Sequence, residues 1–112
     1  MIEKVVRDYL VTQLNNVPVY LEIPANPPKK YVFVQKTGST KTNHIESSMF
    51  AFQSYDTSLL KACELNETVK AAIEDMITLD EIGSVTRNSD YPFPDADRKE
   101  YRYQAVFEIT HY

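Results

Sequence analysis

The sequence holds few of the residues that cross-link a chain, loosen its backbone or anchor it in a membrane. Its 112 residues include one cysteine, Cys63, two glycines and no tryptophan. A lone cysteine excludes an intramolecular disulfide and fits a reducing compartment. No apolar run approaches the roughly 18 residues of a membrane span, and the charged start MIEKVVRD lacks the pattern of a secretory leader. We therefore expect a cytosolic protein without membrane contact.

The rest of the composition is that of an ordinary globular domain. Hydrophobic residues make up 43% of the chain and charged residues 25%, unlike the compositions typical of disorder. The net charge of −4 argues against nonspecific attraction to nucleic acid or anionic membranes. Without repeats or low-complexity tracts, residues 1–112 are expected to form one domain. Eight tyrosines and five phenylalanines provide aromatic surface of the kind that sheets and protein contacts use.

Two segments have the apolar spacing of amphipathic helices. From Ile2 to Leu14 apolar residues recur at steps of three and four, and Asn15-Asn16 follows as a helix stop. The stretch Gln53–Ile77 ends a strand and then becomes the longest periodic helix, capped by Asp56 or Ser58. The apolar stripe of this helix consists of Ala62, Leu65, Val69, Ala72, Ile73 and Met76. We expect it to cover the sheet around which the chain is built.

Five segments have the alternation, or the β-branched and aromatic content, of strands. They are Val17–Ile23, Tyr31–Lys36, His44–Tyr55, Glu81–Asp90 and Tyr101–Tyr112. The polar segment Thr37–Asn43 is expected to form the tip of a hairpin that projects beyond the core. The predicted fold is α+β in the order α-β-β-β-α-β-β, with a largely antiparallel sheet packed against two helices.

The last predicted strand has the clearest two-sided pattern. One side alternates with polar residues and is expected to face the core, and it consists of Tyr101, Tyr103, Ala105, Phe107 and Ile109. Three other tyrosines at strand margins suit either the rim of the core or a subunit interface: Tyr31, Tyr91 and Tyr112.

Fragments of catalytic and metal-binding patterns occur, but each lacks a required part. The segment QKTGSTKT has Thr40 and Gln35 where a phosphate-binding loop needs glycines. His44, His111 and Cys63 contain no closely spaced pair of the kind found in zinc sites. The acidic loop with Asp95, Asp97 and Glu100 lacks the glycine of a calcium loop. We expect no catalytic residue, metal or cofactor, and we rank an enzyme last among the function classes.

The order of these elements resembles a family of small neck proteins. The strand end "QSY", the helix segment "ETVKAAIEDM", the strand "VPVYLEIP" and the closing "YRYQAVFEIT" are similar to the tail terminators of long-tailed bacteriophages, also called tail completion or head–tail joining proteins. The resemblance spans essentially the whole chain. It rests on patterns of strand and helix, without invariant chemistry.

This resemblance implies a structural assembly protein of the virion, made in the host cytoplasm, that works as a hexameric ring. Such a ring caps the tail tube, binds the head-side connector, and lets DNA pass without reading its sequence. Two segments unexplained by the core are then expected to contact neighbouring subunits, tube or connector. They contain Lys36, Thr37, Gly38, Ser39, Thr40, Lys41, Thr42, Asn43, His44, Tyr91, Asp95, Asp97 and Arg98. The alternatives are another neck or minor tail protein of the same fold, or a small ligand-binding or regulatory module of the host.

Overall fold

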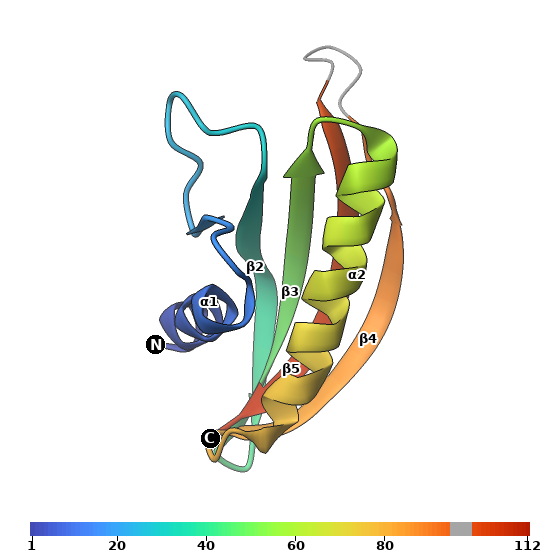
Figure 1. Ribbon diagram of the computed structural model, residues 1–112. Coiled ribbons are helices and arrows are strands. Elements are labelled where there is room, and N and C mark those ends of the chain that lie inside the picture. Colours follow the sequence, from blue (N-terminus) through green and yellow to red (C-terminus); the bar gives the residue numbers. More distant parts are fainter. Residues whose placement is uncertain (95–99) are drawn as a thin grey trace.

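The protein folds as a five-stranded sheet with both helices on one face (Figure 1). The structure, a computed structural model, describes residues 1–94 and 100–112. Its elements in chain order are α1 (Ile2–Gln13), β1 (Val19–Tyr20), β2 (Tyr31–Thr42), β3 (Ile45–Asp56), α2 (Leu59–Asp75), the 3-10 helix η1 (Met76–Thr78), β4 (Ile82–Pro92) and β5 (Tyr101–His111). The predicted α+β class and order of elements are confirmed.

The strands lie in the order β1-β2-β3-β5-β4. The pairs β2–β3, β3–β5 and β5–β4 are antiparallel, and the short β1 pairs with β2 in parallel. The prediction of a largely antiparallel sheet is therefore correct. Strand β3 is central, because β2 and β5 flank it along nearly its whole length.

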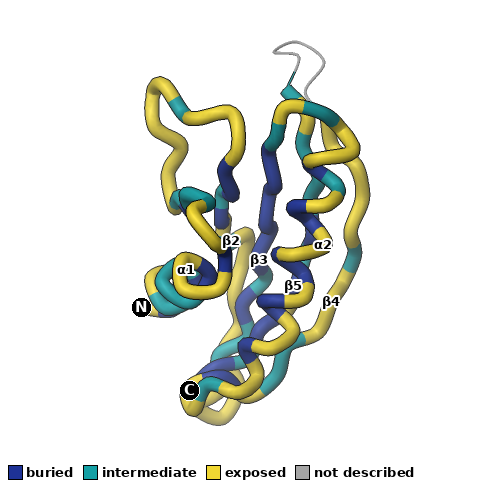
Figure 2. Tube along the Cα trace, viewed as in Figure 1, coloured by how far each residue is buried: buried dark blue, intermediate teal, exposed yellow. Residues whose placement is uncertain are grey.

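A single core fills the space between the helices and the sheet (Figure 2). Helix α1 contributes Val6 and Leu10, while α2 contributes Val69 and Ile73. The sheet contributes alternate residues of its three long inner strands: Val32, Val34, Phe50, Phe52, Ala105, Phe107 and Ile109. The apolar stripe predicted for the second helix is thus the surface that α2 buries.

The predicted start of the second helix and the predicted stop after the first are confirmed, whereas α2 ends at Asp75 and Ile77 lies in η1. Ser58 caps α2, since its side chain accepts a hydrogen bond from the Lys61 N–H at 3.1 Å. Asp56 instead accepts from the adjacent Thr57 N–H at 2.7 Å. After α1, Asn16 has a φ of 58°, the left-handed conformation that Asn tolerates at a helix stop.

The second strand differs from its predicted end. Strand β2 continues through the segment predicted as a polar connection and stops only at Thr42. The turn consists of Asn43 and His44 alone, with φ values of 51° and 70°. Positive φ at both positions identifies the two-residue turn that suits the twist of a hairpin. Residues 37–45 are all exposed, so the tip projects as expected, but as paired strand.

Three other predictions need correction. The first predicted strand, Val17–Ile23, shrinks to Val19–Tyr20, because Leu21 and Ile23 are exposed and unpaired among the described residues. Tyr101 does not belong to the core, since 44% of it is exposed. Tyr103 is only half-buried. Tyr103 nevertheless faces α2, because its hydroxyl contacts the Cys63 thiol of that helix.

Candidate functional site

The described residues of the two predicted contact segments lie toward opposite ends of an elongated molecule. The chain measures 44 × 25 × 24 Å, and its long axis follows the strands (Figure 1). The turn Asn43–His44 lies at one end, beside the C-terminus, whereas Tyr91 lies toward the other end near the last residues of β3. Asp95, Asp97 and Arg98 lie outside the described residues. The structure therefore separates Tyr91 from the hairpin tip instead of joining the two into one site.

The charges of the hairpin are partly compensated within the chain. Lys36 Nζ lies 3.6 Å from Glu3 Oε2 on α1. Lys41 is the direct cross-strand partner of Glu46, and opposite charges stabilise such pairs. Contacts of Lys36 with another subunit would therefore compete with Glu3, which the sequence pattern did not reveal.

The face of the sheet away from the helices carries a continuous band of aromatic rings and one arginine. Tyr20 of β1 meets Tyr31 edge-on, with centroids 5.7 Å apart, and Tyr31 stacks on Tyr55 at 4.3 Å. The Arg102 guanidinium lies 5.8 Å from the Tyr55 ring centroid and 4.2 Å from that of Phe93. The band ends in the edge-on contact of Phe93 with Tyr91, at 6.0 Å.

Arg102 joins the two halves of this aromatic band. Its Nη1 donates to the Tyr55 hydroxyl at 3.0 Å and its Nε donates to the Phe93 carbonyl at 2.6 Å. Among residues 1–94 and 100–112, no carboxylate forms an ion pair with it. The guanidinium plane thus bonds to neutral oxygens and stacks on rings, a combination that lysine cannot reproduce.

A hydrogen-bonded row runs beside the aromatic band. The Tyr55 hydroxyl donates to Gln53 Oε1 at 2.9 Å, and Gln53 Nε2 donates to Gln104 Oε1 at 2.9 Å. Gln104 Nε2 then donates to the Tyr91 hydroxyl at 2.6 Å. The row connects β3, β5 and β4 through neutral side chains. Arg102 is the one charged residue of the band and the row together. Such a surface suits contact with another protein better than contact with phosphate.

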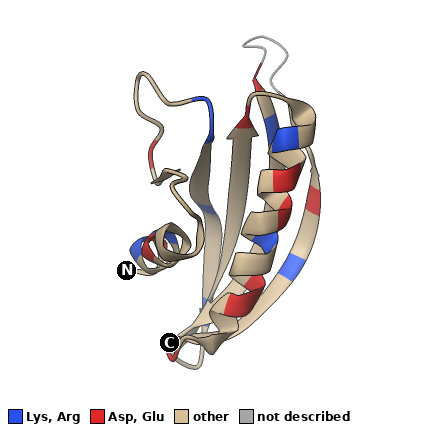
Figure 3. Cartoon of the chain, viewed as in Figure 1, with Lys and Arg blue, Asp and Glu red and all other residues tan. Residues whose placement is uncertain are grey.

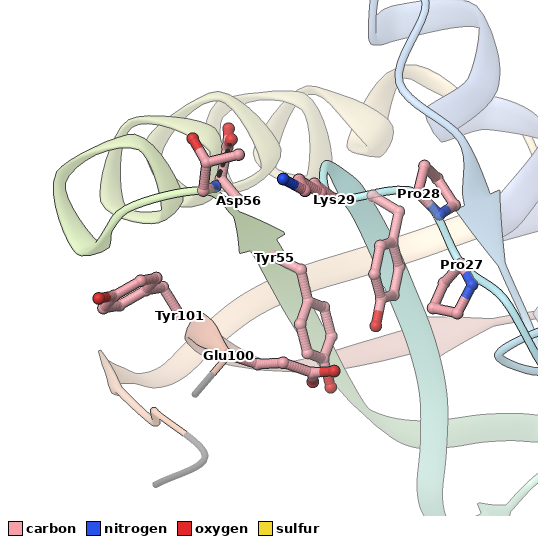
Figure 4. A pocket seen from close by; sticks show the side chains of 9 residues that line it. Pro27, Pro28, Lys29, Tyr55, Asp56, Glu100 and Tyr101 are labelled. Carbon is pink, nitrogen blue, oxygen red and sulfur yellow. Dashed lines mark hydrogen bonds between the residues drawn. The ribbon is translucent and has the colours of Figure 1, made fainter. Parts of the chain in front are cut away.

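At one end of the band the stacked tyrosines form a wall of a pocket (Figure 4). The pocket has a volume of about 310 Å³, at the lower limit for sites that enclose small molecules. Its lining comes from the loop before β2, the end of β3 and the start of β5: Pro27, Pro28, Lys29, Tyr31, Tyr55, Asp56, Thr57, Glu100 and Tyr101. Burial raises the pKa of Tyr31 above its usual 10, and nearby Tyr55 and Glu100 raise it further.

One contact has the composition, but not the arrangement, of a catalytic triad. Ser48 Oγ lies 2.9 Å from His111 Nε2, and Glu46 Oε2 lies 3.8 Å from the same nitrogen. A relay requires the serine and the carboxylate to bond opposite nitrogens of the ring. Ser48 is also completely buried, so no substrate can reach it. His44 is at the exposed turn and is not one of the partners in this contact.

Cys63 and Lys70, both on α2, make structural contacts. A hydrogen bond with the Cys63 thiol raises the pKa of the Tyr103 hydroxyl, and burial adds to the effect. Lys70 Nζ lies 2.7 Å from Glu67 Oε1 and 3.1 Å from Asp90 Oδ2, and it is buried, which the sequence did not predict. Among the described residues, no three His, Cys, Asp or Glu side chains lie close enough to hold a metal ion. Nor is any helix of the described chain long and apolar enough to cross a membrane.

Sequence reasoning missed the aromatic band as a unit. The surplus of tyrosine and phenylalanine was its one visible signal, and the strand register decides which of these rings meet.

The sequence matches no protein-family model, and no curated protein matches it at a significant level.

Proposed function

We propose that the chain is a structural subunit of the neck of a long-tailed bacteriophage, a tail terminator that caps the tail tube and joins it to the head-side connector. The proposal starts from the resemblance of the sequence to that family. It places the protein in the virion, as a ring of six around a channel through which DNA passes without base-specific contacts. The subunit has an assembly role and no catalytic one.

The observation that supports this function is the placement of two exposed sites, the turn Asn43–His44 and Tyr91, toward opposite ends of the long axis. A joint between tube and connector needs subunits that present a different surface to each partner. The turn Asn43–His44 provides one such surface, and the end with Tyr91 and the pocket at Tyr31 and Tyr55 provides the other. The acidic residues that predominate along α2 would repel DNA phosphates from any channel that this helix lines (Figure 3).

The experiment is to add the purified chain to its tail tube protein during polymerisation and to measure tube length by electron microscopy. We expect tubes that stop growing and carry a ring at one end. Tubes that elongate unchecked would exclude the terminator role and leave another neck or minor tail protein as the best reading.

Two variants separate the ends in the same assay. His44→Glu changes the turn end, and Tyr91→Ala changes the opposite end. If each end serves one partner, one variant loses tube capping and the other loses connector binding, each with the second activity kept. Loss of both activities in both variants would contradict this division of the surfaces.

The pocket supports a second candidate function, a small ligand-binding module. Three tyrosines and two prolines give it an apolar wall, while Lys29, Asp56 and Glu100 supply polar groups. Screening a library of small metabolites by ligand-observed NMR tests this reading. A ligand whose signals respond to Tyr31→Ala but not to Tyr20→Ala would favour it over the assembly role.

A further inference from the structure

Both outer strands of the sheet leave part of their edge open. β1 covers the edge of β2 only at Val32 and Phe33. Among the described residues, no strand pairs with β2 beyond Phe33 on that side, or with the outer edge of β4. Open edges present backbone N–H and C=O groups to which another strand can bind.

The closed parts of the two edges lie in the same row of the sheet. Cross-strand partners connect Val32 to Ser54, Ser54 to Tyr103, and Tyr103 to Pro92. At one end of this row β1 covers Val32 through its partner Val19. At the other end Pro92 has no N–H to donate, which prevents regular pairing.

The open parts of the two edges also lie level with each other. One row of partners ends at Gln35 on β2 and at Ser89 on β4, and a second ends at Lys41 and Ile82. Residues 35–41 of one edge therefore span the same rows as residues 82–89 of the other. The two edges are thus covered in the same rows of the sheet and open in the same rows. The open edge of one copy can therefore lie alongside the open edge of another.

The strand directions favour this arrangement. Three antiparallel steps separate β2 from β4, so these two strands run in opposite directions. When two copies stand side by side in the same orientation, β2 of one meets β4 of the next in antiparallel fashion. This is the more stable strand pairing, and the contact joins two different surfaces, as a ring requires.

The side chains of the two open edges are compatible. Gln35–Thr42 contains two lysines and no carboxylate, whereas residues 80–90 contain three carboxylates and one arginine. Both segments are rich in small hydroxyl side chains: Ser39, Thr40 and Thr42 on one, Ser84, Thr86 and Ser89 on the other. Opposite charges and paired hydroxyls both stabilise neighbouring strands.

We propose that neighbouring copies pair the open edge of β2 with the open edge of β4 and so join their sheets into one continuous sheet. This contact rests on the proposed function, which supplies the ring, and it adds which surfaces of two subunits meet. The outer strands contain irregularities at Lys36/Gly38, Ile82/Ser84 and Arg87/Ser89. Bulges bend and twist a strand, and a sheet that closes on itself needs such curvature.

The hydrogen-bond pattern between the strands shows which backbone N–H groups of β2 and β4 point to the open edges. Thr42 and Ile45 flank the two-residue turn and pair with each other, so alternation turns the N–H of Ser39 to the open edge. On β5, Tyr112 donates to Glu81 and Arg102 accepts from Phe93, so the even-numbered residues between them bond to β4. Val85 lies opposite Ile109, and its N–H therefore faces outward.

These two positions give a specific test of the pairing. Ser39→Pro and Val85→Pro each remove one outward N–H and leave the hydrogen bonds inside the sheet in place. Circular dichroism first establishes that each variant is folded, and multi-angle light scattering and native mass spectrometry then measure the mass. We expect an assembled wild type, two monomeric variants, and a dimer when the variants are mixed. The mixture stops at two subunits because each variant keeps one intact edge.

Lys41→Glu and Glu81→Lys provide a second test that leaves the backbone unchanged. Each should weaken assembly at least tenfold in concentration, and the two charge changes together should restore part of it. Proline variants that assemble like the wild type, or a mixture that yields no dimer, would overturn the pairing. A wild type that stays monomeric up to millimolar concentration and on tube ends also overturns it. The tube-length assay then decides the terminator role separately.

Discussion

The rings of Tyr31 and Tyr55 stack face to face across two strands, with centroids 4.3 Å apart and planes inclined by 10°. The two residues are direct partners in the β2–β3 register. Both are buried although they lie on the sheet face without helices. The stack therefore supplies a small apolar cluster to that face, and it also walls the pocket at this end of the molecule.

The position of Tyr31 in this stack makes the stability of the protein decrease at high pH. Burial, followed by the nearby Tyr55 and Glu100, raises the pKa of Tyr31 above its usual 10. A raised pKa contributes stability that is complete below about pH 10 and is lost as the pH rises further. Between about pH 10 and about pH 12, the free energy of unfolding of Tyr31→Phe should decrease less than that of the wild type. Urea titrations at several pH values measure the free energy of unfolding of each protein. Tyr112→Phe, a change at an exposed tyrosine, is the control.

Arg102 is expected to stabilise the aromatic band. Arg102→Met removes hydrogen bonds to the Tyr55 hydroxyl and the Phe93 carbonyl and the contact with the Phe93 ring. The free energy of unfolding should fall by about 2 kcal/mol, since charged hydrogen bonds contribute about 1.5–3 kcal/mol each and this site is half-exposed. Arg87→Met is the control, because its ion pairs of 3.8 and 4.0 Å are at the surface. Equal losses in both variants would refute a special role for Arg102.

The contrast between helices and strand ends explains what the sequence predicts well. Helix α2 and strand β5 are each buried on one side only, and the buried residues of β5 include Ala105, Phe107 and Ile109. One-sided burial produces a helical spacing of apolar residues in α2 and an alternating one in β5, and these spacings predict both elements. The second half of β2 has no buried side, because residues 37–42 are all exposed, and its polar sequence resembles a loop. The aromatic band combines residues from all five strands, and only the register shows that they meet.

Asn66 is expected to reduce stability at its present position in α2. It is fully buried, and neither its Oδ1 nor its Nδ2 has a hydrogen-bond partner among the described residues. A buried polar group without a partner costs about 1–3 kcal/mol. Asn66→Leu should therefore raise the free energy of unfolding by about 1 kcal/mol, with part of the gain lost to a changed shape.

Chemical denaturation of Asn66→Leu is compared with that of Thr68→Leu, an exposed substitution on the same helix. The exposed variant should stay within about 0.5 kcal/mol of the wild type. A loss of stability in Asn66→Leu would mean that the amide is bonded in solution and that its burial is compensated.

The turn of the β2–β3 hairpin contains a strained backbone conformation at His44. His44 adopts a φ of 70° at the second position of the two-residue turn, where glycine is preferred. Left-handed backbone costs an L-residue about 1–2 kcal/mol, and glycine avoids this cost while losing some entropy on folding. His44→Gly should therefore raise the free energy of unfolding by roughly 1 kcal/mol, measured by thermal and urea denaturation.

His44→Ala is the matched control, because it removes the imidazole and keeps the Cβ that makes positive φ unfavourable. A gain confined to the glycine variant assigns the effect to the backbone, whereas equal gains in both would assign it to the side chain. Asn43 precedes His44 with a φ of 51° and tolerates this conformation better than most residues. Asn43→Ala should therefore destabilise the hairpin. A turn that accepts His44→Gly with no change in stability would mean that the strain is relieved in solution by a different turn.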